Sequence, residues 1–235
     1  MMIILILAST TMLYAQGSLG VQIGYAQPTT QLNTPDLGKT LTPTIYNGLK
    51  LGLVYETTII KGFGVNMGLN YTFGANATDW MKKVTNQPVD YPKVRSKRQY
   101  HQLEIPIDWQ YKFEIAKGTW LIVYTGPTLQ CGLYMDEKWY INTGKVNGIT
   151  LTQTENLYSA EDMNDYALKR INVTWGVGAG FQYERYFLRG GYDFGLINPY
   201  KSYQFDVLVD EGQPRTRGRF DQWQIKIGMY LWESK

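Results

Sequence analysis

The sequence predicts an all-β fold, an eight-stranded antiparallel up-and-down transmembrane β-barrel with long extracellular loops and short periplasmic turns. Two observations carry this prediction. Apolar residues recur with a period of two in eight segments, and the connections between those segments alternate between short and long. Antiparallel strands joined in this way place the tight turns at one end of a barrel and the long loops at the other.

Four of the eight segments alternate almost without exception. In Phe63–Phe73 every odd-numbered residue is apolar and no even-numbered residue is, and Leu103–Phe113 repeats the pattern. The other two are Val173–Tyr183 and Trp223–Leu231. The pattern is weaker in four more segments, which are Leu19–Tyr25, Leu49–Tyr55, Leu121–Leu133 and Leu188–Leu196. Because side chains along a β-strand point to opposite faces in turn, all eight are predicted strands. No long segment has convincing helical periodicity.

The connections between these strands differ sharply in length. A few residues suffice around Ile60–Gly62, Ala116–Gly118 and Glu184–Tyr186. The other connections are long, rich in Asn, Asp, Thr, Lys and Pro, and cover about residues 28–45, 74–99, 135–170 and 197–218. No linker divides the chain, so we expect one barrel domain over residues 16–235. Residues 1–15 carry no charge and are expected to form a signal peptide, the alternative being a buried N-terminal strand.

Composition excludes several other classes of protein. Beyond residue 15 no run approaches the ~18 apolar residues of a membrane-spanning helix. A hydrophobic content of 44% is too high for a disordered chain. The single cysteine, Cys131, cannot support an intramolecular disulfide framework or a cysteine-cluster zinc site. A net charge of +3 is too small to indicate a nucleic-acid partner.

Three features indicate that the apolar face of the barrel points outward, into lipid. Glycine is frequent on the polar face, where small residues suit a narrow interior. These glycines are Gly64, Gly68, Gly176, Gly178, Gly180 and Gly228. Aromatic residues lie near both ends of the segments, as in the two aromatic girdles of membrane barrels. They are Tyr55, Phe63, Phe113, Trp120, Tyr183 and Trp232 at the turn end, with Trp232 on the polar phase, and Tyr25, Tyr71, Phe73, Tyr192, Phe194 and Trp223 at the loop end.

Strand length is the third feature. A strand of about 11 residues, rising ~3.3 Å per residue and tilted by about 45°, spans ~25 Å, which is the height of an outer-membrane apolar band. The alternative is a soluble barrel with an apolar interior, such as a lipocalin. A lipocalin requires a ligand cavity, and its early Gly-x-Trp signature is absent.

Three short motifs resemble a known family. They are Leu103–Ile107 (LEIPI), Thr125–Pro127 (TGP) and Gly191–Leu196 (GYDFGL), and a signal ending in Ala15-Gln16 is also usual there. In these motifs the chain resembles the small outer-membrane β-barrel ("porin family", PorT-like) proteins of Bacteroidota. The resemblance implies an eight-stranded barrel related in architecture to the membrane domain of OmpA and to OmpX. It implies a fold and an outer-membrane location more than an activity.

The sequence offers little sign of catalysis. The lone histidine, His101, begins a strand at the loop rim, and the His-x-Ser motif of barrel lipid deacylases is missing. Gly176–Gly180 has the glycines of a dinucleotide loop but places them at period two inside a strand. The acidic pairs Glu161/Asp162 and Asp210/Glu211 lie in long loops without the ligand spacing of a calcium loop. We therefore expect no enzyme activity, no cofactor and no metal site.

Charged residues on the polar face predict a charge network in the lumen. They are Lys50, Glu56, Glu104, Asp108, Lys112, Arg189, Asp193 and Lys226. Because both signs occur and an eight-stranded barrel has room only for side chains, we expect mutual neutralisation and no open channel. The alternative is a gated proton or ion path.

Basic residues precede three of the strands that start at the loop end. They are Lys93, Arg95, Lys97, Arg98, Lys169, Arg170, Arg215, Arg217 and Arg219. Since arginine and lysine both bind phosphate, these side chains are candidates for a collar that holds the phosphates of lipopolysaccharide. The alternatives are solvated loop charge and an electrostatic dock for an acidic partner or glycan.

We expect a non-enzymatic barrel in the outer membrane of a Gram-negative bacterium, with its specific role in the long extracellular loops. Its expected partners are outer-membrane lipid and lipopolysaccharide. The second hypothesis is that the protein is a subunit of a larger secretion, uptake or assembly complex, in which its partners would include other envelope proteins. The third is a lipid-modifying enzyme, for which His101 is the only candidate base.

Overall fold

The structure is a computed structural model that describes residues 16–34, 39–79, 93–142, 151–156, 158, 168–199 and 217–233. Its ten strands form one sheet, and two of them, β2 and β7, lie outside the closed ring, which leaves eight in the ring. The ring strands are β1 (Gln16–Thr34), β3 (Asn47–Ile60), β4 (Phe63–Asp79), β5 (Lys93–Ala116), β6 (Thr119–Asn142), β8 (Ile171–Tyr183), β9 (Tyr186–Gly195) and β10 (Arg217–Glu233).

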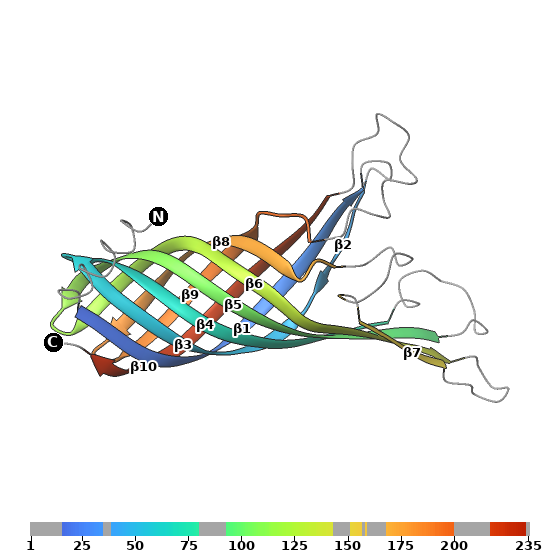
Figure 1. The fold of residues 1–235 in the computed structure, drawn as a ribbon, viewed down its shortest axis with the longest axis horizontal. Helices are drawn as coiled ribbons and strands as arrows, with labels where there is room; N and C mark the ends of the chain where they lie inside the picture. Colours follow the sequence, from blue (N-terminus) through green and yellow to red (C-terminus); the bar gives the residue numbers. More distant parts are fainter. Residues whose placement is uncertain are drawn as a thin grey trace, which may run out of the picture.

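Each ring strand pairs antiparallel with the next one along the chain, and β10 pairs with β1 to close the barrel (Figure 1). Closure leaves no open sheet edge, which hydrocarbon could not solvate. The predicted eight-stranded antiparallel barrel is therefore confirmed. Among the described residues no helix is long and apolar enough to cross a membrane. The expected signal peptide, residues 1–15, lies outside the described residues.

The strands extend further at the loop end than the sequence predicted. β5 begins at Lys93 instead of Leu103, and β6 continues to Asn142. Two short strands, β2 (Lys39–Ile45) paired with β1 and β7 (Leu151–Asn156) paired with β6, lie mainly in segments predicted as loops. The predicted strands were too short because the hydrogen bonding between neighbouring strands can continue beyond the lipid, where no alternating apolar face is needed.

Tight turns define the opposite end of the barrel. β3 and β4 are joined by Lys61-Gly62, with Gly62 at φ +81°, and β5 and β6 by Lys117-Gly118, with Gly118 at φ +74°. Glycine adopts this left-handed conformation without steric cost. The third turn uses Glu184 at φ 48°. These turns keep neighbouring strands in register and place the strand ends Gln16 and Glu233 at the same end of the barrel.

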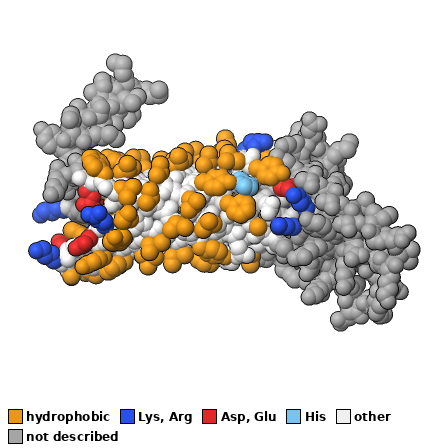
Figure 2. Space-filling view, turned by 90° about the horizontal axis from the view of Figure 1, so that it is seen from below, with side chains coloured by type: hydrophobic (Ala, Val, Ile, Leu, Met, Phe, Trp, Pro, Cys, Tyr) orange, Lys and Arg blue, Asp and Glu red, His pale blue; other side chains and the backbone are white. Residues whose placement is uncertain are grey.

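The wall of the barrel reverses the usual distribution of apolar residues. Large apolar side chains on every ring strand are exposed, as Ile23, Leu51, Leu69, Ile107, Val123, Val177, Leu188 and Ile225 illustrate. Figure 2 shows apolar side chains along the wall and charged side chains at its two ends. The buried side chains are instead mostly polar or charged. Only a lipid environment makes this exposure favourable, as the alternation predicted.

Trp232 departs from the alternation for a local reason. The sequence places it on the polar phase, yet its side chain is exposed. Leu19 pairs with Trp232 while the next residue, Gly20, pairs with Tyr230, so Leu231 is an extra residue in β10. This bulge shifts the phase by one residue and turns both Leu231 and Trp232 outward.

Apolar clusters close the lumen at both ends. Val54, Phe187 and Tyr230 pack together near the turns. Tyr46, Tyr100, Met135 and Leu168 pack together near the loops, with Tyr158 against them. Glu56 lies nearer the turn than Val54 on β3, so the charged side chains pack beside the turn-end cluster, and together they occupy the narrow lumen.

Candidate functional site

The interior of the barrel holds the predicted lumen charges. All eight side chains point inward from β3, β5, β9 and β10, and Lys112 is the only one that is not fully buried. Lys50, Lys112, Arg189 and Lys226 are matched in number by Glu56, Glu104, Asp108 and Asp193. Their arrangement comes from the strand period alone: each one occupies the inward phase of its strand.

One ion pair joins Lys50 of β3 to Glu104 of β5. Lys50 Nζ lies 2.5 Å from Glu104 Oε2, and both side chains are 1% exposed. Lys50 also donates to Gln224 Oε1 at 2.6 Å. The second carboxylate oxygen of Glu104 accepts from Thr72 Oγ1 at 2.7 Å and from Gln102 Nε2 at 3.4 Å. Each charge therefore has a charged and a neutral partner, as burial of an ion pair requires.

Glu56 is the centre of a second cluster nearer the turns. Its carboxylate binds Lys112 Nζ through Oε1 and Arg189 Nη2 through Oε2, the latter at 2.9 Å. Tyr230 Oη also donates to Glu56 Oε2 at 2.5 Å. Arg189 Nη2 reaches Gln110 Oε1 at 3.0 Å. One carboxylate thus forms ion pairs with two cations, Lys112 of β5 and Arg189 of β9.

The remaining lumen charges are less directly matched. Asp193 Oδ2 accepts from Gln224 Nε2 at 2.8 Å and from Gln222 Nε2 at 3.4 Å. Asp108 and Lys226 are buried, and within the described part of the chain neither one makes a hydrogen bond or an ion pair. Of the two acids on β5, Glu104 forms an ion pair with a lumen cation and Asp108 does not.

The basic residues at the rim have different surroundings. Lys97, Lys169, Arg170 and Arg219 are exposed, and Arg98 is half-buried. Arg219 is neutralised by Asp221, with Nη2 2.6 Å from Oδ2. The other rim candidates, Lys93, Arg95, Arg215 and Arg217, have side chains outside the described residues. The described cations come from β5, from the residues before β8 and from β10, and the predicted collar stays a prediction.

Comparison with known proteins agrees with the geometry. Residues 14–200 match the family described as outer membrane protein beta-barrel domain. The chain belongs to this family. It is an outer-membrane β-barrel of the Gram-negative type, with an outward apolar wall and an inward polar face. No curated protein matches its sequence.

Solved outer-membrane barrels have the same type of fold at low sequence identity. The attachment invasion locus protein Ail of Yersinia pestis is 12% identical, with 92% of this chain and 99% of that chain covered and a TM-score of 0.41. Neisserial surface protein A is 11% identical, with 90% and 97% covered and a TM-score of 0.38. The N-terminal barrel domain of Pseudomonas aeruginosa OprF is 10% identical, with 88% and 97% covered and a TM-score of 0.28.

His101 lies on the outer wall of this outer-membrane barrel. Its Nδ1 is hydrogen-bonded to Tyr71 Oη, and its ring lies 5.0 Å from Phe73 and 6.0 Å from Tyr134. These contacts make it part of the aromatic girdle at the loop end. Among the described residues no group of three or more His, Cys, Asp and Glu could hold a metal ion. Glu161/Asp162 and Asp210/Glu211 lie outside the described residues.

Sequence reasoning missed the aromatic side chains that point into the barrel. Tyr100, Tyr124, Phe187 and Tyr230 are buried, although aromatic residues were expected mainly on the outer wall. A signal was available in the inward glycines of neighbouring strands. A Cβ on Gly178, for example, would lie 2.3 Å from Tyr124 Cζ, so the absence of a side chain there makes room for the ring.

Proposed function

We propose that this protein is a non-enzymatic outer-membrane barrel that displays its long loops at the cell surface and has a structural or interaction role. The observation that carries the proposal is the filled lumen. Salt-bridged side chains occupy its centre and apolar clusters close both ends, so the wall, the mouth and the loops remain for contact with other molecules.

The PorT-like motifs Leu103–Ile107, Thr125–Pro127 and Gly191–Leu196 support a finer placement among the small barrels of Bacteroidota. The composition of residues 1–15 supports export through a signal peptide that is cleaved near Ala15.

Two measurements on the native protein test the proposed role. Planar-bilayer recordings of the reconstituted barrel should show no large stable conductance, because no continuous water column passes the charged centre. A stable open channel would contradict the proposal. Purification from the native membrane in mild detergent should give the barrel without a fixed protein partner. A stoichiometric complex would favour the alternative role as a subunit of an envelope machine.

We also propose that rim lysines hold lipopolysaccharide phosphates. Lys97 and Lys169 support this use because they are exposed and make no ion pair within the described residues. Lysine attracts phosphate as a point charge, and a lysine at a membrane surface contributes about 1 kcal/mol of attraction to anionic lipid.

A double substitution, Lys97→Gln with Lys169→Gln, should reduce the lipopolysaccharide that co-purifies with the folded barrel. The matched control is Lys61→Gln with Lys117→Gln, which removes the same charge from exposed positions at the turn end and should leave lipid retention unchanged. Equal retention of lipopolysaccharide by both variants would show that the rim lysines are ordinary solvated charges that do not hold lipid.

A further inference from the structure

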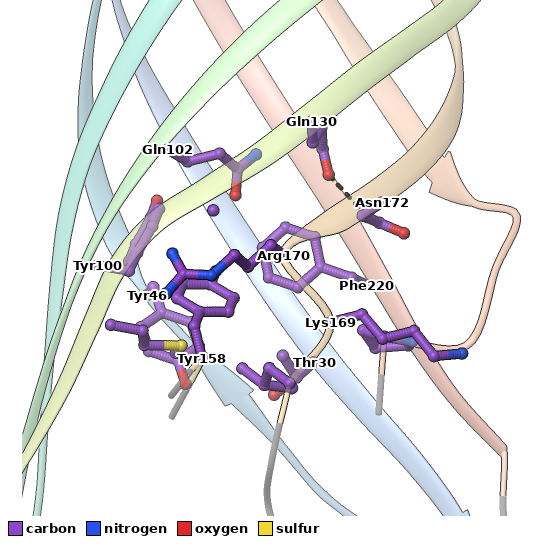
Figure 3. A pocket seen from close by; sticks show the side chains of 14 residues that line it. Thr30, Tyr46, Tyr100, Gln102, Gln130, Tyr158, Lys169, Arg170, Asn172 and Phe220 are labelled. Carbon is purple, nitrogen blue, oxygen red and sulfur yellow. Dashed lines mark hydrogen bonds between the residues drawn. The ribbon is translucent and has the colours of Figure 1, made fainter. Parts of the chain in front are cut away.

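The loop end of the barrel contains a hollow with an empty volume of about 470 Å³, which includes the open solvent at its entrance. Tyr46, Tyr158 and Phe220 form aromatic walls, and Gln102, Gln130 and Asn172 line the side toward the barrel centre (Figure 3). The hollow lies above the salt-bridged centre, and its lining combines ring-strand residues such as Gln102 and Gln130 with Tyr158 and Arg170 of the connection between β7 and β8.

Two buried amides in this hollow have unmatched polar atoms. Gln130 and Asn172 are 1% and 8% exposed, and Asn172 Nδ2 donates to Gln130 Oε1 at 2.7 Å. That bond leaves Gln130 Nε2 as a donor and Asn172 Oδ1 as an acceptor without a partner. Exchanging nitrogen and oxygen in both amides preserves the bond and again leaves one donor and one acceptor. Tyr100 Oη is a third buried polar atom without a partner.

Burial of an unmatched polar atom is unfavourable, so these atoms favour a ligand that both donates and accepts hydrogen bonds. A hydrocarbon or a simple aromatic ring would leave all three unmatched. Hydroxyl groups satisfy donors and acceptors alike. The polar side of the hollow therefore suits a polyhydroxylated molecule, and its aromatic walls suit the apolar face of a ring.

Arg170 adds a positive charge at the edge of the hollow. Its main-chain oxygen accepts from the N–H of Gly132 at 2.6 Å, and its Nη1 donates to the carbonyl oxygen of Leu133 at 3.1 Å. The guanidinium lies 5.6 Å from the centre of the Tyr158 ring, whose pKa burial raises to about 12, which keeps the phenol neutral. No described acidic residue forms an ion pair with Arg170.

The neighbouring cation does not share this orientation. Figure 3 shows Arg170 extending across Tyr158 and the side chain of Lys169 directed away from the other labelled residues. A positioned guanidinium with free donors suits a carboxylate, which it can bind through two parallel hydrogen bonds.

We infer that the mouth of the barrel binds one acidic sugar residue, of the uronic acid class, with its carboxylate on Arg170. The ring face packs on the aromatic walls, and the hydroxyls bind Gln130, Asn172 and Tyr100. The inference goes beyond the display of loops because it names a site of defined residues and the class of molecule that the site binds. The sugar acid is either free or the terminal residue of a glycan.

Calorimetry on the full chain, folded in detergent micelles, tests the site with three small probes. Sodium D-glucuronate should bind at least tenfold more tightly than D-glucose, which lacks the carboxylate, or benzoate, which lacks the hydroxyls. Equal binding of benzoate and glucuronate would overturn the assignment. The absence of glucuronate binding would also overturn it, because ordered water alone would then satisfy the two amides. A glucuronate-terminated oligosaccharide that binds at least as tightly identifies a glycan as the source, and binding of the monosaccharide alone identifies a free acid.

Variants separate the roles of charge and hydroxyl recognition. Arg170→Gln should weaken glucuronate binding about tenfold and leave the weak binding of glucose unchanged. Lys117→Gln, which removes one positive charge from an exposed position at the turn end, should change neither. Gln130→Leu should weaken both sugars. Heat-dependent migration on a mild gel verifies that each variant is folded. Undiminished glucuronate binding by both folded Arg170→Gln and folded Gln130→Leu would refute the proposed site.

Discussion

Replacing Lys50 with methionine should destabilise the barrel more than replacing Lys50 and Glu104 together. Lys50→Met leaves the Glu104 carboxylate buried, with only the neutral donors of Thr72 and Gln102. Breaking one side of a buried ion pair costs about 3–5 kcal/mol. Glu104→Gln should cost a similar amount, since the buried Lys50 would keep only neutral oxygen acceptors, such as that of Gln224.

The double variant, Lys50→Met with Glu104→Gln, contains no unmatched charge at this point of the lumen. Its expected cost is about 1–3 kcal/mol, from the hydrogen bonds that are lost. The two single effects therefore should not add, and the coupling free energy should amount to several kcal/mol.

Urea unfolding of the barrel in lipid vesicles, followed by tryptophan fluorescence, measures these differences. With a slope of about 3 kcal/mol per molar urea, each single variant should lower the midpoint by about 1–2 M. Lys61→Met, at an exposed turn position, is the control and should not move it. Additive single effects would show that Lys50 and Glu104 contribute to stability independently, and the assignment of a neutralised lumen would be wrong.

Two further predictions follow from packing and hydrogen bonding. Gly178→Ala should lower the unfolding free energy by about 1–3 kcal/mol, because the added Cβ would lie 2.3 Å from Tyr124 Cζ. Gly190→Ala, whose nearest contact would be at 3.8 Å, is its control in the same urea assay, and equal effects would contradict the packing argument. Thr125→Val should cost about 1–2 kcal/mol, because Trp175 Nε1 donates to Thr125 Oγ1 at 2.9 Å on the lipid-facing wall. If Thr125→Val costs little in a Trp175→Phe background, the hydrogen bond between the two side chains is the source of the cost. If Thr125→Val costs the same in that background, the cost has another source.

The sequence by itself determined the architecture and the two faces of the wall. Because a strand repeats every two residues, a one-residue slip would move every apolar side chain from lipid to lumen. The regular alternation of segments such as Phe63–Phe73 therefore fixes which side chains point inward. Lys50 and Glu104 could be assigned to the lumen on this basis without knowledge of their partners. The period fails only where the ladder is interrupted, as it is at the bulge that turns Trp232 outward.

The tertiary structure decided which inward residues meet. Lys50 of β3 and Glu104 of β5 are separated by β4 in the ring, and Arg189 of β9 reaches Glu56 from the opposite side of the lumen. These contacts depend on strand stagger and on the curvature of the closed ring, which no local pattern encodes. The hollow at the mouth has the same origin. Arg170 and Tyr158 come from the same connection, and only the tertiary structure places them beside Tyr46 and Phe220, which line the same hollow.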